Sequence, residues 1–203
     1  MRIRMWAGLA VAASFGLGGV SQAMARETET FTATMLQNAN MRQSSSRTFP
    51  ITFHVESWTT EEDGARLQAI LKERGPDGLL REFQKGKTRA GYIVSPALAR
   101  EASWRVAMAT TADTPRGRVV RLLTDRPIEF AEAYYGARSL DYEFAAFEFT
   151  LDAKGRGQGI AIPAARLLQD AEGQVTLETL PYTTGPERLI GVRTWGREKK
   201  GSK

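Results

Sequence analysis

The chain has 203 residues, of which 42% are hydrophobic, and it carries a formal net charge of +5. This length and composition predict one globular domain with its own core and argue against a disordered chain. The absence of cysteine excludes disulfides, thiol nucleophiles and thiolate metal ligands, and a single histidine, His54, excludes a multi-histidine metal site. We therefore expect neither a metal nor a cofactor.

Residues 1–25 have the pattern of an export signal. Arg2 and Arg4 precede an apolar run that is shorter than an ordinary membrane span of about 20 residues, and Ala23-Met24-Ala25 has the form of a cleavage site. An uncleaved N-terminal anchor is the alternative. We expect a mature chain of residues 26–203 that is periplasmic or secreted, has no membrane span and carries a formal charge of +3 once the two arginines are removed.

The first two predicted strands cover residues 29–36 and 49–58. In both, apolar residues alternate with polar ones, which is typical of strands with one buried face. We expect the two strands to pair as a hairpin with a long loop. His54 and Glu56 share a face of the second strand, and their pair would serve either as a proton shuttle or, as we expect, as a structural hydrogen bond.

Residues 59–86 form the one predicted helical region. Thr59 and Glu62 fit a capping box, and the pair one residue further along fits it less well. Apolar residues follow at helical spacing, and Gly75-Pro76 interrupts them, which predicts two short helices. This helical hairpin is expected either to pack on the sheet as a lid or plug or to lie on the surface between strands.

The remaining chain again favours strands. In residues 103–111 the alternation places Trp104, Val106 and Met108 on one side. The pattern of residues 140–180 predicts a β-meander with two Asp-Ala-x-Gly turns. The strands predicted after the helices are 89–95, 103–111, 118–124, 128–135, 142–151, 158–163, 174–180 and 189–195.

These elements predict a mainly β (β-rich α+β) fold, namely an antiparallel barrel or strongly curled sheet with one inserted helical hairpin. The helices fall in one block, which argues against a parallel α/β fold. We expect a signal peptide over 1–25, a single β-rich domain over 26–196 with the hairpin at 59–86, and a basic flexible tail over 197–203.

The densest polar cluster runs from Thr124 to Glu129. Asp125 and Glu129 are spaced so that they would act as acid and base, with Arg126 holding an anionic substrate. The alternative is a turn in which Arg126 pairs with a neighbouring acid, and this is the interpretation we favour.

Aromatic residues are concentrated where the meander begins. Phe147 and Phe149 share the register expected to face inward. Tyr142 and Phe144 share the other register with Glu148, and an aromatic ring beside a carboxylate is less typical of a dry core. These three residues are therefore the candidates for binding a small apolar or sugar-like ligand.

The glycines at 155, 157 and 159 resemble a phosphate-binding loop only superficially. The strand–turn–helix context and the Lys-Ser/Thr of such loops are missing. We expect these glycines to provide positive φ angles and a bulge between two strands.

Four segments resemble a group of uncharacterised secreted bacterial proteins that have no assigned activity. They are Thr124-Asp125-Arg126-Pro127-Ile128, the run Phe147–Asp152 leading into the three glycines, Pro163-Ala164-Ala165, and Trp58-Thr59-Thr60 before the helix. The resemblance covers most of the mature chain and implies export, without a mechanism.

From these features we expect an exported β-domain without enzymatic activity that binds a small ligand or an envelope partner. One alternative is an enzyme that uses Asp125 and Glu129 with Arg126 on a carbohydrate or carboxylated substrate. Another is an envelope interaction protein that acts through an exposed strand edge. Export argues against a nucleic-acid partner.

Overall fold

The computed structural model describes residues 2–3, 28–37, 47–86, 89–96, 103–128, 142–169, 175–179 and 186–195. One helix, α1 (Glu61–Gln84), interrupts a series of strands. The strands are β1 (Arg2–Ile3), β2 (Glu29–Gln37), β3 (Arg47–Val55), β4 (Gly91–Val94), β5 (Ser103–Thr114), β6 (Gly117–Thr124), β7 (Phe144–Leu151), β8 (Arg156–Gln169), β9 (Val175–Thr179) and β10 (Glu187–Trp195).

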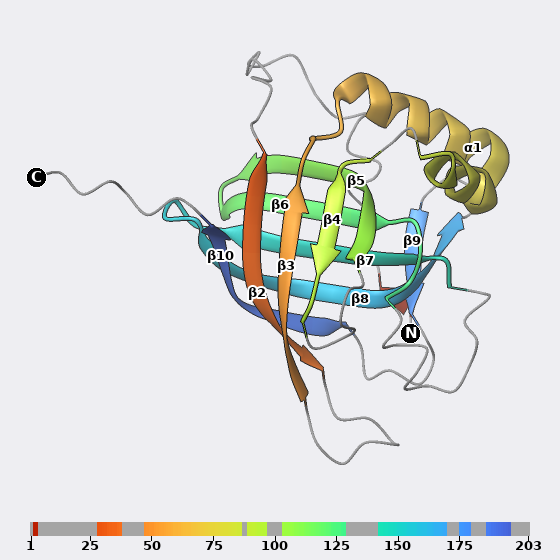
Figure 1. The fold of residues 1–203 in the computed structure, drawn as a ribbon. Coiled ribbons are helices and arrows are strands. Elements are labelled where there is room, and N and C mark those ends of the chain that lie inside the picture. Colours follow the sequence, from red (N-terminus) through yellow and green to blue (C-terminus); the bar gives the residue numbers. More distant parts are fainter. Residues whose placement is uncertain are drawn as a thin grey trace, which may run out of the picture.

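Eight antiparallel strands close into a barrel in the order β8-β10-β2-β3-β4-β5-β6-β7, with β7 pairing back onto β8 (Figure 1). β9 pairs with the last residues of β8, beyond the part that β10 covers, and β1 pairs with β9. The predicted antiparallel barrel is therefore confirmed. All eight barrel strands follow residue 28, so closure does not depend on β1, which lies in the predicted signal segment.

The alternation read from the sequence sets which side chains point into the barrel. In β2, Phe31, Ala33 and Met35 are buried, whereas the threonines between them lie on the outer face and are half-buried. β2 and β3 pair along their whole length, from Glu29 opposite Val55 to Gln37 opposite Arg47, as the predicted hairpin requires.

One predicted face is wrong in β5. The register of β5 on β6 shifts between Val106 and Met108, which marks an irregularity of the kind that a β-bulge produces. Trp104 and Val106 pack inside the barrel, but Met108 packs outside it, in the cluster beneath α1. Strict alternation fails here because an extra residue reverses the direction of every side chain after it.

β8 extends further than the sequence predicted. We expected a strand over 158–163, but β8 continues to Gln169 past Pro163. The register with β7 shifts by one residue near Pro163, because Ala146 lies opposite Ile162 and Phe144 opposite Ala165. A bulge tolerates a residue that has no N–H to donate. The strand predicted over 128–135 falls on residues 129–135, outside the described residues, apart from the buried Ile128.

The helical region consists of two helical segments that meet at a kink at Gly75, as the sequence predicted, and that together form α1. Gly75 has φ 65° and ψ −170°, which places it outside helical geometry and allows Pro76 to follow. The N-cap is Thr60, whose hydroxyl accepts a hydrogen bond from the Asp63 N–H at 3.1 Å. Thr59, which the sequence favoured as the cap, instead accepts a hydrogen bond from the Ala109 N–H at 3.1 Å and so ties the helix entry to β5.

α1 packs against the outside of the barrel and of β9 (Figure 1). This second apolar core includes Phe83 and Phe144, whose rings meet edge to face at 6.2 Å. The other buried members are Leu67, Leu71, Leu79, Ala107, Met108, Leu123, Ala146, Ile162, Ala165, Leu167 and Leu177. The helix is therefore packed on the sheet, as the first of the two predicted arrangements requires.

Glu82 holds a small charge network on α1. Its carboxylate accepts hydrogen bonds from Lys85 Nζ at 2.9 Å and Arg66 Nη1 at 2.6 Å. These hydrogen bonds, with that from Lys85 the larger cause, lower the pKa of Glu82 below its ordinary value. The same contact with Glu82 raises the pKa of Arg66. Because Arg66 precedes the kink and Glu82 follows it, the network joins the two halves of the helix.

The glycine-rich turn joins β7 to β8. Gly155 has φ 72°, as expected for a turn residue, but Gly157 and Gly159 are strand residues with another role. A Cβ on Gly157 would lie 1.8 Å from the Thr150 carbonyl oxygen, and one on Gly159 would lie 2.1 Å from the Glu148 oxygen. These glycines permit the close approach of β7 and β8 on which barrel closure depends.

Candidate binding face

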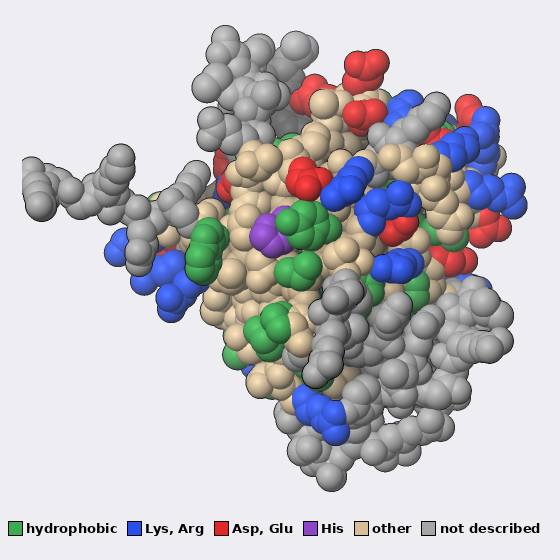
Figure 2. Space-filling view, viewed as in Figure 1, with side chains coloured by type: hydrophobic (Ala, Val, Ile, Leu, Met, Phe, Trp, Pro, Cys, Tyr) green, Lys and Arg blue, Asp and Glu red, His purple; other side chains and the backbone are tan. Residues whose placement is uncertain are grey.

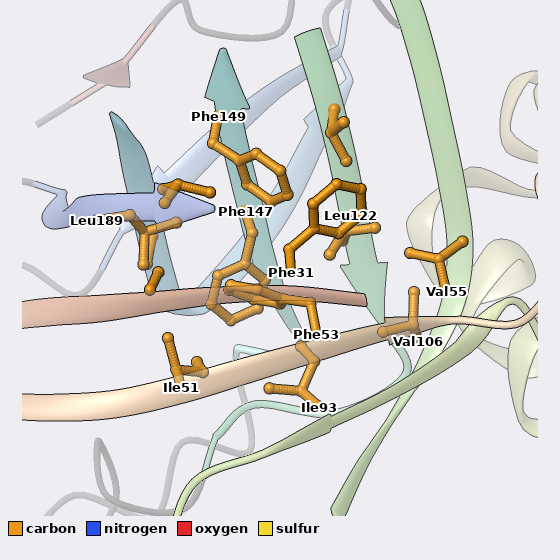
Figure 3. Close-up of a cluster of buried hydrophobic side chains, with 14 of the residues drawn as sticks. Phe31, Ile51, Phe53, Val55, Ile93, Val106, Leu122, Phe147, Phe149 and Leu189 are labelled. Atoms are coloured by element: carbon orange, nitrogen blue, oxygen red, sulfur yellow. The ribbon is translucent and has the colours of Figure 1, made fainter. Parts of the chain in front are cut away.

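The barrel interior is a packed aromatic core. The Phe53 ring meets Phe147 at 5.1 Å and Phe149 at 5.5 Å, and Phe31 meets Phe149 at 5.1 Å (Figure 3). The two phenylalanines of β7 face inward, as the sequence predicted. With rings from β2, β3 and β7 filling it, the barrel has the interior of a stable core, as is usual for barrels of about eight strands.

A largely buried ion pair joins β6 to the start of β2. Arg118 of β6 donates to both oxygens of Glu29 at 2.7 Å and to the Thr111 hydroxyl at 2.9 Å. Its guanidinium carbon lies 5.1 Å from the centre of the Trp58 ring. Every strong partner that this arginine requires is thus supplied by the protein, which makes the cluster a structural element.

The proposed catalytic cluster is only partly described. Asp125 forms an ion pair with Arg105 of β5, and Arg105 Nη2 also donates to the Phe83 carbonyl oxygen at 3.0 Å. Arg126 donates to the Ser103 carbonyl oxygen at 2.8 Å, and Glu129 lies outside the described residues. Asp125 is therefore brought together with Arg105, a residue that the sequence analysis did not single out. Its other oxygen, Oδ1, is buried without a hydrogen-bond partner in the described structure.

The three residues proposed to hold a ligand have different environments. Phe144 is fully buried against Phe83 beneath α1. Glu148 accepts a hydrogen bond from Arg121 Nε at 2.6 Å on the outer face of β6 and β7. Tyr142 is half-buried just before β7. The Phe144 ring is part of the core between α1 and the sheet, so its prediction as a ligand-binding residue is wrong. Aromatic residues that could contact a ligand lie elsewhere on the barrel.

A row of side chains crosses the outer face of five neighbouring strands. The strand registers place Trp195 of β10 opposite Thr30, Thr30 opposite His54, His54 opposite Tyr92, and Tyr92 opposite Arg105. We call these five residues the outer row. Strands lie about 4.8 Å apart, so four steps give a row of about 19 Å along the curved surface.

Three members of the outer row, Thr30, His54 and Tyr92, contact one another. The His54 and Tyr92 rings are stacked at 4.5 Å with an angle of 22° between their planes. Thr30 Oγ1 lies 3.1 Å from His54 Nδ1, within hydrogen-bond distance. Trp195 is 73% exposed, and it is the only large hydrophobic side chain of the described residues that is exposed. In Figure 2 the single histidine lies at the surface between hydrophobic side chains.

The His54 partners differ from those that the sequence suggested. Glu56, which follows the last residue of β3, pairs with Arg89 at 3.1 Å. The expected hydrogen bond between His54 and Glu56 is therefore wrong, and the contacts of His54 come from Thr30 of β2 and Tyr92 of β4. Local spacing could not reveal this row, because its members lie on five different strands and only the strand order brings them together.

The described residues contain no group of three or more His, Cys, Asp or Glu side chains suited to a metal ion. Within the same residues no helix has the length and apolarity that crossing a membrane would need. No family model matches the chain, and neither a curated protein nor a solved structure shows significant similarity to it. The class of protein is therefore defined by the fold, a closed antiparallel barrel with one packed helix and an aromatic row on its outer face.

Proposed function

We propose that this protein is an exported binding domain without enzymatic activity, and that the outer row holds a sugar-like ligand. Trp195 carries this proposal, because its large exposed ring lies in line with the stacked His54 and Tyr92 rings. Sugar rings have apolar C–H faces and hydroxyl rims. Exposed aromatic faces beside hydroxyl and imidazole groups match both features.

The packed interior supports placing the ligand outside the barrel. Rings from three strands occupy the space that ligand-binding barrels of this size leave open for a small molecule. A polymer or an oligosaccharide fits an outer face better than a closed chamber, because an open surface does not limit the length of the ligand.

Binding by the purified protein to a panel of polysaccharides, measured by calorimetry and affinity electrophoresis, tests this function. Trp195→Ala should weaken binding about tenfold or more, as expected when a stacking ring is lost, and Trp195→Phe should retain part of the affinity. Unchanged affinity in Trp195→Ala, or binding to no polysaccharide, would reject the outer row as the site.

Export is the second part of the proposal and rests on the pattern of residues 1–25. Cell fractionation of the native host and mass measurement of the mature chain test it directly. We expect an extracytoplasmic protein that begins at Arg26. A cytoplasmic protein that retains residues 1–25, including the β1 pairing with β9, would contradict it.

The enzyme alternative retains one supporting observation, the unpartnered Oδ1 of Asp125 beside Arg105. It predicts turnover of a carbohydrate or carboxylated substrate that Asp125→Asn abolishes. The strand-edge alternative is weakened because the eight barrel strands close into a ring. Among the described residues, the stretches of β3 and β5 that extend beyond the four-residue β4 have no strand partner on that side, and these are the edges that a partner would extend.

A further inference from the structure

The strand β10 changes its inside–outside pattern at Gly191. The registers of β10 with β2 and with β8 both shift around this residue, and Gly191 has φ 61°. Leu189 and Val192 are both buried inside the barrel, although they are three residues apart. One extra residue is therefore accommodated here, as in a β-bulge that contains a glycine with positive φ.

This bulge determines which face Arg193 and Trp195 occupy. Without it, the alternation that turns Leu189 inward would also turn residues 193 and 195 inward. With it, Arg193 lies opposite Thr32 and Trp195 opposite Thr30, and both threonines belong to the outer face of β2. Arg188, opposite Leu36, lies on the same outer face ahead of the bulge.

The charges on this face are unbalanced. Arg188 and Arg193 are exposed, and neither has a carboxylate partner among the residues that the structure describes. Three acids near this face already have arginine partners, since Glu56 pairs with Arg89, Asp125 with Arg105, and Asp152 with Arg156, the residue opposite Arg193 on β8. An exposed guanidinium without a partner is suited to hold a carboxylate through two parallel hydrogen bonds.

We propose that the ligand of the outer row is an acidic polysaccharide, whose sugar ring lies on Trp195 while Arg193 binds a carboxylate of that ring or of the next one. This inference rests on the proposed function and specifies its ligand. Arg193 and Trp195 are two residues apart on one strand face, so their side chains are neighbours. A single uronic acid unit carries both an apolar ring face and a carboxylate, and it can therefore contact both side chains at once. Arg188 extends the positive charge along β10 toward further carboxylates.

The test compares a polyuronate with the same polymer after methyl esterification, which removes its charge and keeps its sugar backbone. The protein should bind the polyuronate about tenfold more tightly, as the loss of one charge-assisted contact predicts. Arg193→Gln should remove most of this preference, so that the variant binds the two polymers with nearly equal affinity. Arg81→Gln, which removes an exposed arginine from α1, is the matched control and should leave the preference intact.

The outcomes separate the two proposals. Equal affinity for both polymers, or an unchanged preference in Arg193→Gln, overturns the acidic ligand and leaves a neutral sugar ligand in place. Equally tight binding to polyglutamate, an acidic polymer without sugar rings, also overturns it, because charge alone would then account for binding. Binding to none of the polysaccharides overturns both proposals. A thermal unfolding curve for each variant confirms that the barrel is intact.

Discussion

His54 and Tyr92 lie opposite each other on β3 and β4, and their rings stack at 4.5 Å on the outside of the barrel. The backbones beneath them approach closely because the neighbouring residue is Gly91. A Cβ at Gly91 would lie 1.9 Å from the His54 carbonyl oxygen, and its φ of 155° disfavours other residues. The stack therefore depends on a glycine that contributes nothing to the surface itself.

Gly91→Ala should destabilise the protein by about 3 kcal/mol. To accommodate the added Cβ, either β3 must move away from β4 or the backbone of β4 at residue 91 must adopt a strained conformation. Gly64→Ala is the matched control. Gly64 lies in α1 with no atom within 4 Å of an added Cβ, so this change should stabilise the protein by up to about 1 kcal/mol. Denaturant unfolding measures both, and similar effects of the two changes would contradict the close approach.

Removing one partner of the Arg118–Glu29 ion pair should cost about 3 kcal/mol of unfolding free energy, because the remaining charge is left largely buried. Arg118→Met and Glu29→Gln test each side. The double variant should be more stable than the sum of the two single losses predicts, since it leaves neither charge unpaired. Additive losses in this cycle would show that the pair does not interact in solution.

The Glu82 network predicts a stability change in acid. Because the folded protein lowers the pKa of Glu82, its contribution is fully present above the ordinary glutamate pKa of about 4.3 and is lost as pH falls through the lower folded value. Glu82→Gln should therefore destabilise the protein at pH 7 and have a smaller effect near pH 3. Glu73→Gln, at an exposed glutamate of the same helix, should show little change at either pH. A Glu82→Gln effect that grows in acid would contradict this assignment.

The Asp152 turn adds to the same acid dependence. Its carboxylate accepts hydrogen bonds from the Arg156 and Lys154 N–H groups at 2.9 and 2.8 Å, and the Arg156 bond is the larger cause of its lowered pKa. Its contribution is likewise present above the ordinary aspartate pKa and lost in acid. Asp152→Asn should loosen the β7–β8 turn, measured as faster amide exchange at Lys154 and Arg156. Unchanged exchange at both amides would contradict this role.

Alternating apolar residues predicted most of the fold. Phe31, Met35, Phe147 and Phe149 all face inward as expected, because a buried face imposes period two on a strand. Met108 was placed on the wrong side, and β8 was predicted too short at Pro163, because each lies beside a register shift. Such shifts depend on the neighbouring strand, which local periodicity does not contain.

The binding face was harder to find for the same reason. His54, Tyr92 and Trp195 lie in one row only because β3 lies between β2 and β4 and because β10 closes the barrel beside β2. The direction of Trp195 depends further on the register shift at Gly191. Phe144, which the sequence favoured as a ligand residue beside Glu148, proved to be covered by α1, an element distant in sequence.

Side-chain NMR during titration with polysaccharides tests the central claim most directly. The account predicts that the indole N–H of Trp195 and the ring signals of His54 and Tyr92 shift together and saturably, while the buried Trp104 indole stays unchanged. Saturable shifts confined to the surroundings of Asp125 and Arg105, with Trp195 unaffected, would contradict the outer row as the binding face.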